Sequence, residues 1–309
     1  MKILVTGGAG FIGSHLVDRL IKGGHDVVVI DNLSTGKKEN LNLNAKFYKI
    51  DIRDPKISRI FKKEKPRVVF HYAAQIEARK SVEEPVSDAE INIVGSLNIL
   101  KNCKKYGIKK IIFASSGGEI YGDAEEIPTP ETYVPSPISP YGIGKLAVEG
   151  YLNSYYQMFK MSFTALRYGN VYGPRQDPNG EAGIIAIFIK KMLEGKQPII
   201  HGDGKQTKDY IFIEDAVETT MLSFKKDFIG ILNIGTEKET SVLEIFYKLK
   251  ELTHSRVKEK HIPLPPCGFK RGCLSIKKAK KELGWQPKYS LEKGLKKTVE
   301  FFKNLLNKK

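Results

Sequence analysis

Tyr141 and Lys145 are four residues apart, so a helix over this segment would place a phenol and an ammonium one turn apart on the same face. A nearby ammonium stabilises a phenolate, whose parent phenol has a pKa of about 10, and the tyrosine can then act as a general base near neutral pH. Only this pair begins a helix directly after a proline-rich loop. We predict an acid–base pair here, and helix-surface positions for three other pairs with the same spacing, Tyr106/Lys110, Tyr156/Lys160 and Tyr289/Lys293.

A glycine-rich run, TGGAGFIG, places Gly7, Gly10 and Gly13 three residues apart, directly after an apolar strand-like run. One glycine permits a tight turn, one lets the backbone approach a pyrophosphate, and one lets the next helix pack on the strand. The N-terminus of that helix adds N–H donors and a positive dipole. The run predicts a dinucleotide-binding loop, to which we also assign Phe11 and Ile12.

Asp31 ends the second expected strand, 18 residues after Gly13. A carboxylate at this position can accept hydrogen bonds from both ribose hydroxyls of an adenosine, and it disfavours a 2′-phosphate. The predicted cofactor is therefore NAD, with Asn32 beside Asp31 in the same site. No residue is predicted to bind a metal.

The elements that position these residues follow from the hydrophobic pattern of the first half, where short apolar runs alternate with longer amphipathic segments. Runs of Val and Ile without polar alternation favour a parallel sheet covered on both faces. We predict an α/β fold with a Rossmann-type doubly wound parallel sheet. The expected strands are Lys2–Thr6, Asp26–Ile30, Lys46–Ile50, Arg67–Phe70 and Lys110–Ala114, and the expected helices include Phe11–Lys22, Ile57–Lys63 and Val86–Tyr106.

The pattern becomes less regular after a strand expected at Ser162–Leu166, where loops rich in Gly and Pro appear. We expect a smaller α/β substrate-binding lobe, with helices near Ile184–Glu194, Val242–Leu252 and Leu291–Leu306. The predicted NAD-binding domain comprises 1–167 plus about 207–235, and the lobe comprises 168–206 plus 236–309. The chain is expected to rejoin the sheet around Asp209–Ile213 and Leu232–Ile234.

The composition is that of an ordinary globular protein: 309 residues with 51 Lys+Arg, 35 Asp+Glu and a net charge of +16. Residues 251–309 carry 16 Lys+Arg against 5 Asp+Glu, but these charges lie on amphipathic repeats, so we predict no nucleic-acid partner. No apolar run approaches the roughly 18 residues of a membrane span. An odd number of cysteines (Cys103, Cys267 and Cys273) without a CxxC pair predicts free thiols and a cytoplasmic location.

Several further motifs resemble one family along almost the whole chain: DNLSTG, HYAA, SSGGEIYG, SPYGIGK, RYGNVYGPRQ, GDGKQTKDYIFIEDA and KKELGW. The chain resembles the extended short-chain dehydrogenase/reductases, in particular the NAD-dependent nucleotide-sugar epimerases and dehydratases, and within them the UDP-glucose 4-epimerase branch. In such enzymes the tyrosine takes the proton of the sugar C4 hydroxyl as NAD takes the C4 hydride. The transient 4-keto sugar then rotates and receives the hydride on its other face.

The resemblance implies further site residues. Ser115, at the end of the fifth strand, is assigned to the cofactor, and Tyr141 is assigned to cofactor and substrate. Lys145 would bind the nicotinamide ribose, and Asn170 would hold the substrate diphosphate. The other implied cofactor-binding residues are Asp51 and Ile52 at the adenine, Ala73, Ala74 and Gln75 at the pyrophosphate and ribose, Asn92 near the cofactor loop, and Tyr168 and Val171 at the nicotinamide.

The chain departs from the family pattern at three places in the predicted substrate site: at Gly117, at Lys208, and in PPCGFKRGCLSIKKAK, which has no Asp and in which Lys270 and Arg271 are displaced from the usual Arg. The family has Ser or Thr four residues before the tyrosine of its YG turn, but here that position, counted from Tyr121, is Gly117. We hypothesise that Ser116 or an ordered water bridges the reacting hydroxyl instead, with Gly117 still lining the site. Lys208 stands where the family commonly has Arg, and an ammonium lacks the bidentate fit of Arg to phosphate.

These observations predict an isomerase that epimerises C4 of a UDP-hexose, such as UDP-glucose and UDP-galactose of galactose metabolism or their N-acetyl forms. The partner is the nucleotide-sugar substrate, and the family habit is a homodimer through the helices expected at Val86–Tyr106 and Tyr141–Phe159. One alternative is a nucleotide-sugar decarboxylase or 4,6-dehydratase that uses Glu119, although Gly117 and Gly118 lack the groups those patterns need. A second alternative is a catalytically impaired NAD-binding protein.

Overall fold

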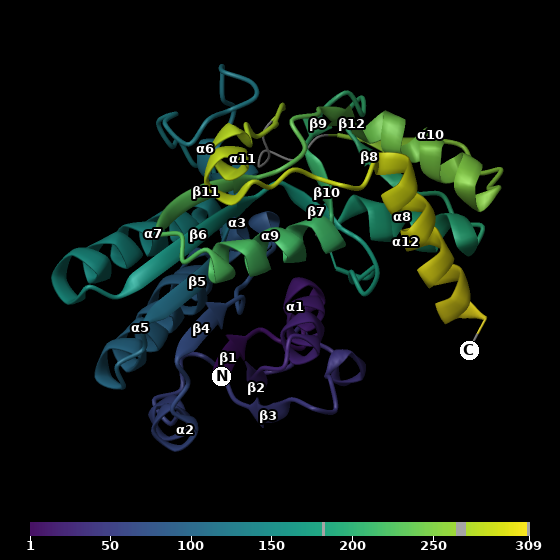
Figure 1. Ribbon diagram of the computed structural model, residues 1–309. Helices are drawn as coiled ribbons and strands as arrows, with labels where there is room; N and C mark the ends of the chain where they lie inside the picture. The colour runs from purple at the N-terminus through teal and green to yellow at the C-terminus, as the bar shows by residue number, and fades with distance from the viewer. Residues whose placement is uncertain (181–182, 264–269, 308–309) are drawn as a thin grey trace. The chain divides into compact units, whose positions relative to one another are not determined.

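The computed structural model describes residues 1–180, 183–263 and 270–307, and the chain forms two compact units (Figure 1). The first unit consists of Met1–Ser116, Ser139–Arg167 and Val217–Leu232; the second consists of Gly117–Ile138, Tyr168–Ala216 and Asn233–Lys309. No helix in the described part of the chain is both long and apolar enough to cross a membrane. Cys103 and Cys273 are buried free thiols, while Cys267 lies outside the described residues.

Seven strands form one sheet in the order β11-β6-β5-β4-β1-β2-β3 (Figure 1). β1 pairs in parallel with β2 and β4, and β2–β3 and β4–β5 are also parallel. The chain order reverses between β1 and β4, and ligands of such sheets bind at the carboxyl ends of the strands near that point. The predicted fold class is therefore confirmed. The strands are β1 (Lys2–Thr6), β2 (Asp26–Asp31), β3 (Lys46–Lys49), β4 (Val68–His71), β5 (Lys110–Ser116), β6 (Ser162–Tyr168) and β11 (Gly230–Ile234).

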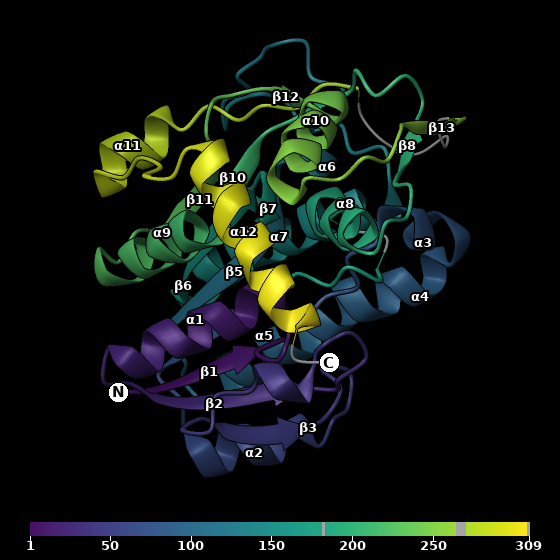
Figure 2. The same cartoon turned by 90° about the vertical axis from the view of Figure 1, so that its right-hand side faces the viewer.

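Helices cover both faces of this sheet because alternate strand residues bury against opposite sides. α1 (Phe11–Lys22) packs on one face (Figure 2), where a Cβ on Gly8 would meet the side chains of Val17 and Val29. The other face carries the main core cluster, to which α2 (Ile57–Glu64), α5 (Gly95–Lys105) and α7 (Pro140–Phe159) contribute residues such as Phe61, Ile99 and Leu152. A short 3-10 turn, η1 (Lys38–Asn40), follows β2.

The helix predicted over Val86–Tyr106 is divided into several elements. The range begins within α4 (Pro85–Ala89), continues through a π-helical turn, η2 (Glu90–Val94), and ends with α5. A separate short helix, α3 (Ala78–Glu83), precedes α4. Within η2 the Asn92 side chain is buried, and Ser96 Oγ donates to the Asn92 carbonyl at 2.6 Å. A π turn of this kind often marks a functional site, because it turns a side chain away from the regular helical positions.

The second unit contains α6 and small two-stranded sheets: β7–β10 and β8–β13 are parallel, and β9–β12 is antiparallel. The prediction that Asp209–Ile213 rejoins the main sheet is wrong, because β11 takes the place beside β6 and β10 pairs with β7; the prediction for Leu232–Ile234 is confirmed. The remaining elements are α6 (Gly117–Tyr121), β7 (Asn170–Tyr172), α8 (Ile184–Leu193), β8 (Ile199–His201), β9 (Thr207–Lys208), β10 (Tyr210–Phe212), α9 (Ile213–Lys225), β12 (Thr240–Ser241), α10 (Val242–Thr253), β13 (Lys260–Ile262), α11 (Lys277–Leu283) and α12 (Leu291–Leu306).

Candidate active site

Gly7 and Gly13, at the two ends of the loop between β1 and α1, have no room for a side chain. Gly7 has a φ of +71°, and a Cβ on it would lie 2.6 Å from the backbone nitrogen of Ala73. A Cβ on Gly13 would collide with the Gly7 carbonyl oxygen, and Gly10 N donates to that same oxygen at 3.1 Å. Gly10 is also the N-cap of α1, so Phe11 and Ile12 lie in its first turn. A bare loop that leads into a helix N-terminus fits a pyrophosphate.

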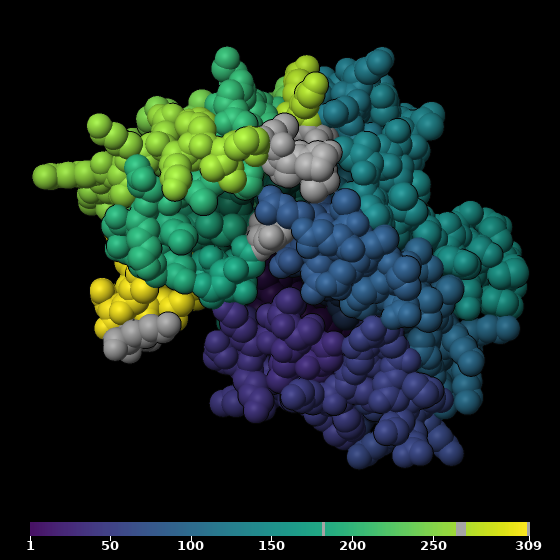
Figure 3. Space-filling model, turned by 180° about the vertical axis from the view of Figure 1, so that it is seen from behind, coloured from purple at the N-terminus to yellow at the C-terminus, as the bar shows by residue number. Residues whose placement is uncertain are grey.

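The surface of the first unit is recessed at its N-terminal residues. Figure 3 shows the dark purple start of the chain set back between the purple segments that follow it and the blue segment after β4. Both Gly7 and Ala73 belong to this part of the unit, at the carboxyl ends of β1 and β4. The recess therefore lies where an open parallel sheet binds its ligand.

Asp31 supports the glycine loop from the end of β2. Its carboxylate accepts hydrogen bonds from the backbone nitrogens of Ala9 at 3.0 Å and Leu33 at 2.8 Å. Burial raises the pKa of Asp31 above its usual range, although these two N–H groups oppose that shift. A carboxylate has about four acceptor positions, so two donors leave capacity for ribose hydroxyls.

The predicted adenine-side residues form a second polar group after β3. Asn32 Nδ2 donates to Asp51 Oδ2 at 2.8 Å, and Arg53 holds the same carboxylate with bonds of 2.9 Å from Nε and Nη2. The pKa of Asp51 is lowered to about 2, chiefly by the hydrogen bonds from Arg53. Ile52 is buried, and its side chain occupies the space that a Cβ on Gly95 would need.

The segment after β4 is tied to η2 by side-chain amides. Gln75 N donates to Asn92 Oδ1 at 2.9 Å, and Asn92 Nδ2 donates to the Gln75 carbonyl at 3.0 Å. The side-chain amides of the same two residues, Gln75 Nε2 and Asn92 Nδ2, each donate to Asp88 Oδ1 at 2.9 Å. Ala73 N donates to Thr6 Oγ1 at 3.2 Å. Ala74 therefore lies between two residues, Ala73 and Gln75, that hydrogen bonds anchor. Sequence reasoning did not single out Asp88.

Tyr141 and Lys145 lie in the first two turns of α7. Ser139 caps this helix by accepting from Gly142 N at 3.1 Å, and Pro140 occupies its first position, as the sequence SPYG favours. Lys145 Nζ donates to the carbonyl of Ala114 at 2.8 Å and lies 5.6 Å from the centroid of the Tyr141 ring. Burial lowers the pKa of Lys145 to about 8, opposed by Asp88 and Glu149. The spacing therefore does bring the phenol ring and the ammonium together.

The three other Tyr-x-x-x-Lys pairs are not placed alike. Tyr156 lies in α7, and Lys160 is the C-cap of the same helix. The prediction of a helix-surface position is wrong for Tyr106/Lys110, because Lys110 begins β5, is buried, and binds Asp227 at 2.8 Å. Tyr289 precedes α12, and Lys293 Nζ lies over its ring.

A buried ion pair, one helical turn after Lys145 on α7, was not predicted from the sequence. Arg167 of β6 donates to Glu149 of α7 from Nε at 3.0 Å and from Nη2 at 2.6 Å, to different carboxylate oxygens. Ser115 Oγ, at the end of β5, donates to Glu149 Oε1 at 2.6 Å. The Ser115 hydroxyl proton is therefore used within the core, whereas Ser116 is partly exposed.

The structure gives a physical reason for the missing hydroxyl at Gly117. This glycine begins α6, and a Cβ on it would lie 2.5 and 2.7 Å from the two terminal methyl carbons of Leu274. Leu274 is buried, and its backbone N donates to Asp209 Oδ2 at 3.1 Å. The buried leucine therefore fills the space where other members of the resembled family carry Ser or Thr.

Gly117→Ser is expected to lower the free energy of unfolding by about 1–3 kcal/mol, because it overpacks the contact with Leu274. Urea denaturation measures this change. Adding Leu274→Ala to the variant should cost less than Leu274→Ala costs alone, since the two sites share one space. Gly150→Ser, in α7 with open space around its Cβ, is the matched control. Strict additivity of the two substitutions would contradict this packing account.

The second unit contains two residues predicted at the nicotinamide, Tyr168 and Val171, and the predicted diphosphate-binding residue Asn170; Tyr168 ends β6 and the other two lie on a short strand. Tyr168 is buried, and Asn170 and Val171 open β7, where they pair with Tyr210 and Ile211 of β10. Asn170 N donates to the Asp209 carbonyl at 2.6 Å, and its side chain is exposed.

Lys208 ends β9 among opposing charges. Burial lowers its pKa to about 7, opposed by the negative charges of Glu119 and Asp123. Arg271 makes two bonds to Glu239, from Nε at 3.0 Å and Nη2 at 2.6 Å, and Glu239 also accepts from the hydroxyl of Thr207, the neighbour of Lys208. Arg271 is thus paired with Glu239, and the charges of Glu119 and Asp123 favour the ammonium form of Lys208.

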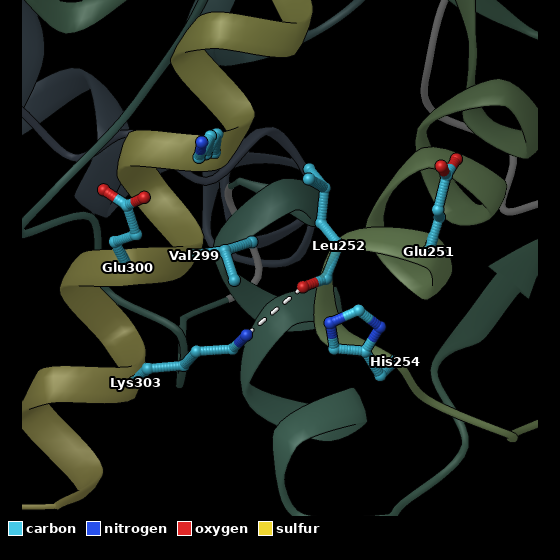
Figure 4. Close-up of a pocket in the computed structure, with 7 residues that line it drawn as sticks. Glu251, Leu252, His254, Val299, Glu300 and Lys303 are labelled. Carbon is cyan, nitrogen blue, oxygen red and sulfur yellow. Dashed lines mark hydrogen bonds between the residues drawn. The ribbon is translucent and has the colours of Figure 1, made fainter.

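A pocket of about 300 Å³ lies between α10 and α12, away from every predicted site residue. Figure 4 shows Lys303 Nζ donating to the Leu252 carbonyl, a bond of 3.3 Å, with His254 beside them. Its lining combines apolar side chains with charges of both signs, such as Glu251 and Lys303. No residue with predicted chemistry lines this pocket, so it does not carry a functional assignment.

Comparisons with known proteins identify the family of the chain. The family model for the NAD dependent epimerase/dehydratase family matches residues 3–235. A UDP-glucose 4-epimerase of Mycolicibacterium smegmatis is 41% identical over 98% of this chain and 99% of its own. The structure of a Thermotoga maritima UDP-glucose 4-epimerase with UDP-glucose is 50% identical, covers 99% of this chain and 100% of its own, and has a TM-score of 0.97. The structure of a Thermus thermophilus UDP-glucose 4-epimerase complex with NAD is 41% identical. It covers 98% of this chain and 99% of its own, and has a TM-score of 0.95. The chain therefore belongs to the NAD-dependent epimerase/dehydratase family.

Proposed function

We propose that this protein is an NAD-dependent isomerase that interconverts the C4 epimers of a UDP-hexose, UDP-glucose and UDP-galactose or their N-acetyl forms. The observation that carries the proposal is the Tyr141–Lys145 pair at the start of α7, together with the side-chain-free glycine loop in the same unit. Full-length identity of 41–50% to UDP-glucose 4-epimerases supports the choice of substrate.

The first unit is proposed to hold the cofactor. The loop with Gly7, Gly10, Phe11, Ile12 and Gly13 would hold the pyrophosphate, and Asp31 with Asn32 would bind the adenosine ribose. The other proposed contacts come from segments anchored by the hydrogen bonds described above. They are Asp51 and Ile52, Ala73, Ala74 and Gln75, Asn92, the Ser115 backbone and Lys145; the family resemblance further implies Tyr168 and Val171 as cofactor residues.

The chemistry that bound NAD supplies is reversible hydride transfer at C4 of the sugar. Tyr141 is the proposed general base, which takes the proton of the C4 hydroxyl and returns it at the end of the cycle. The charged form of Lys145 stabilises the Tyr141 phenolate, and its bond to the Ala114 carbonyl fixes the ammonium beside the ring. Ser116 is proposed to hydrogen-bond the reacting hydroxyl, because Leu274 excludes a hydroxyl side chain at Gly117.

The second unit is proposed to bind the nucleotide sugar. Asn170, with an exposed side chain on β7, and Lys208 at the end of β9 would bind the diphosphate. Glu119 and Asp123 favour the charged form of Lys208, which burial otherwise disfavours. An incoming diphosphate would supply further negative charge and so favour the ammonium more strongly.

A homodimer through the segments Val86–Tyr106 (α4, η2 and α5) and Tyr141–Phe159 (α7) is part of the proposal. These elements of the first unit pack together and expose the apolar side chains of Val86, Val94, Ile143, Tyr151 and Met158, which a partner subunit would cover. The buried free thiols Cys103 and Cys273 support the proposed cytoplasmic location, where thiols stay reduced. Sedimentation equilibrium of the purified chain tests the dimer, and a monomer at micromolar concentration would exclude it.

Proton NMR of the anomeric sugar signals tests the function directly. The purified protein is incubated with UDP-glucose, UDP-galactose and their N-acetyl forms, with and without added NAD. Interconversion of one C4 pair at constant mass is the expected result, and activity without added NAD would indicate retained cofactor. Carbon dioxide release from UDP-glucuronate, without epimerisation of the hexoses, would instead support a decarboxylase that uses Glu119.

A further inference from the structure

Asp88 of α4 is a buried acid whose hydrogen-bond partners are neutral. Only 2% of its surface is exposed, and its Oδ1 accepts from the side-chain amides of Gln75 and Asn92, both at 2.9 Å. Its Oδ2 lies 3.6 Å from the position that a Cβ would take on Gly144, the residue before Lys145. The carboxylate thus lies where the cofactor-side segments meet α7.

We propose that Asp88 is a positioning residue of the Tyr141–Lys145 pair: its buried carboxylate anchors Gln75 and Asn92 and supplies the uncompensated negative charge that keeps Lys145 protonated. The inference rests on the proposed function and adds to it a residue that acts through Lys145. It explains why an acid without a cationic hydrogen-bond partner is buried at this point, since such burial is otherwise costly.

The other charged groups around Lys145 do not replace Asp88. Glu149, one turn further along α7, is bound by the Arg167 guanidinium of β6 at 2.6 Å, so its charge is compensated locally. His71 of β4 lies between Thr6 Oγ1 and Ser96 Oγ, at 2.7 and 2.8 Å, and burial lowers its pKa to about 3, so it is neutral. Charged side chains on α3 and α5, which also pack against α7, are absent from the groups that shift the pKa of Lys145: Arg79, Lys80, Glu83, Lys101, Lys104 and Lys105.

The electrostatics agree in sign with this geometry. Burial lowers the pKa of Lys145 to about 8, and Asp88 is the first of the two acids that oppose the shift. Burial raises the pKa of Asp88, and the positive charge of Lys145 opposes that shift in turn. Without the carboxylate, Lys145 would lose its proton at a lower pH, and the Tyr141 phenolate would lose its stabilising charge in the same range.

Asp88→Asn separates the charge from the anchoring role, because an Asn oxygen can still accept from the two amides. The holoenzyme is purified with its cofactor, and kcat is measured from pH 6 to 10 for wild type, Asp88→Asn, Asp88→Ala and the exposed control Glu83→Gln. We expect the alkaline limb of the kcat profile to move to lower pH by about one unit in both Asp88 variants and to stay in place in the control. An Asp88→Asn profile that coincides with the wild-type profile overturns the proposal, whatever Asp88→Ala does.

A second readout does not need epimerase activity. In protein labelled with ¹³C-lysine, the Cε signal of Lys145, assigned with Lys145→Arg, reports the loss of its proton directly. A lower midpoint in Asp88→Asn supports the proposal even if no UDP-hexose is turned over, in which case only the proposed function fails. An unchanged midpoint in a protein that does epimerise overturns the role of Asp88 and leaves the function intact. Thermal unfolding within a few degrees of wild type confirms that the variant is folded.

Discussion

Tyr141→Phe is expected to reduce the rate of UDP-hexose interconversion about 1,000-fold or more, because it removes the hydroxyl that we propose takes the C4 proton. The phenyl ring remains and preserves the packing of α7, where Lys145 Nζ lies 5.6 Å from the ring centroid. Initial rates are followed by NMR of the anomeric signals. The cofactor content is measured by chromatography of the denatured protein.

NAD should remain bound in this variant, since the glycine loop and Asp31 do not depend on the Tyr141 hydroxyl. The matched control is Tyr156→Phe, the same substitution in a second Tyr-x-x-x-Lys pair of the same helix. It should keep near wild-type activity. If Tyr141→Phe kept more than about a tenth of the activity, Tyr141 would not be the general base, because a missing acid–base group costs about 100-fold at the least.

Features whose cause is local in the chain could be predicted from the sequence. The glycine loop is one, because its turn, its helix N-terminus and the preceding strand are adjacent residues. The start of α7 is another, since Ser139 and Pro140 provide an N-cap and a first position within the same tetrapeptide as Tyr141. For the same reason, the strands of the first half are close to their predicted bounds.

Features that depend on which distant segments meet could not be predicted. The choice of β11 over β10 beside β6 is decided by tertiary pairing, and both segments are short apolar runs. The π turn at η2 has no sequence pattern that would predict it. It lies where the Asn92 side chain forms hydrogen bonds with the backbone of Gln75, a residue outside the helix. The reason for Gly117 was also hidden, since Leu274 lies far away in the sequence.

The supporting charges of the site were missed for a related reason. Asp88 lies among exposed acids such as Glu84 and Glu90, whereas Glu149 is the single acid of α7, and one sequence does not distinguish a buried carboxylate from a solvated one. A weak signal exists for Arg167, which interrupts the apolar strand Ser162–Tyr168. A charge within a buried parallel strand requires a partner, and that rule could have directed attention to an acid on a covering helix.

Arg167→Met is expected to lower the free energy of unfolding by about 3–5 kcal/mol, which is the cost of leaving a buried charge without its partner. Glu149 and Arg167 expose only 2% and 4% of their side chains, and in the variant Ser115 Oγ is the remaining donor described for the carboxylate. Urea denaturation at neutral pH measures the loss.

The double variant Arg167→Met/Glu149→Met separates the ion pair from simple packing. Replacing both partners by apolar side chains of similar length removes the unpaired charge, so the double variant should be more stable than Arg167→Met alone. A double variant that is less stable by the sum of the two single effects would mean that the pair contributes packing and not charge compensation. Because Glu149 lies one turn beyond Lys145 on α7 and binds β5 through Ser115, partial recovery of stability with lower activity would show that the pair also fixes the catalytic turn of this helix.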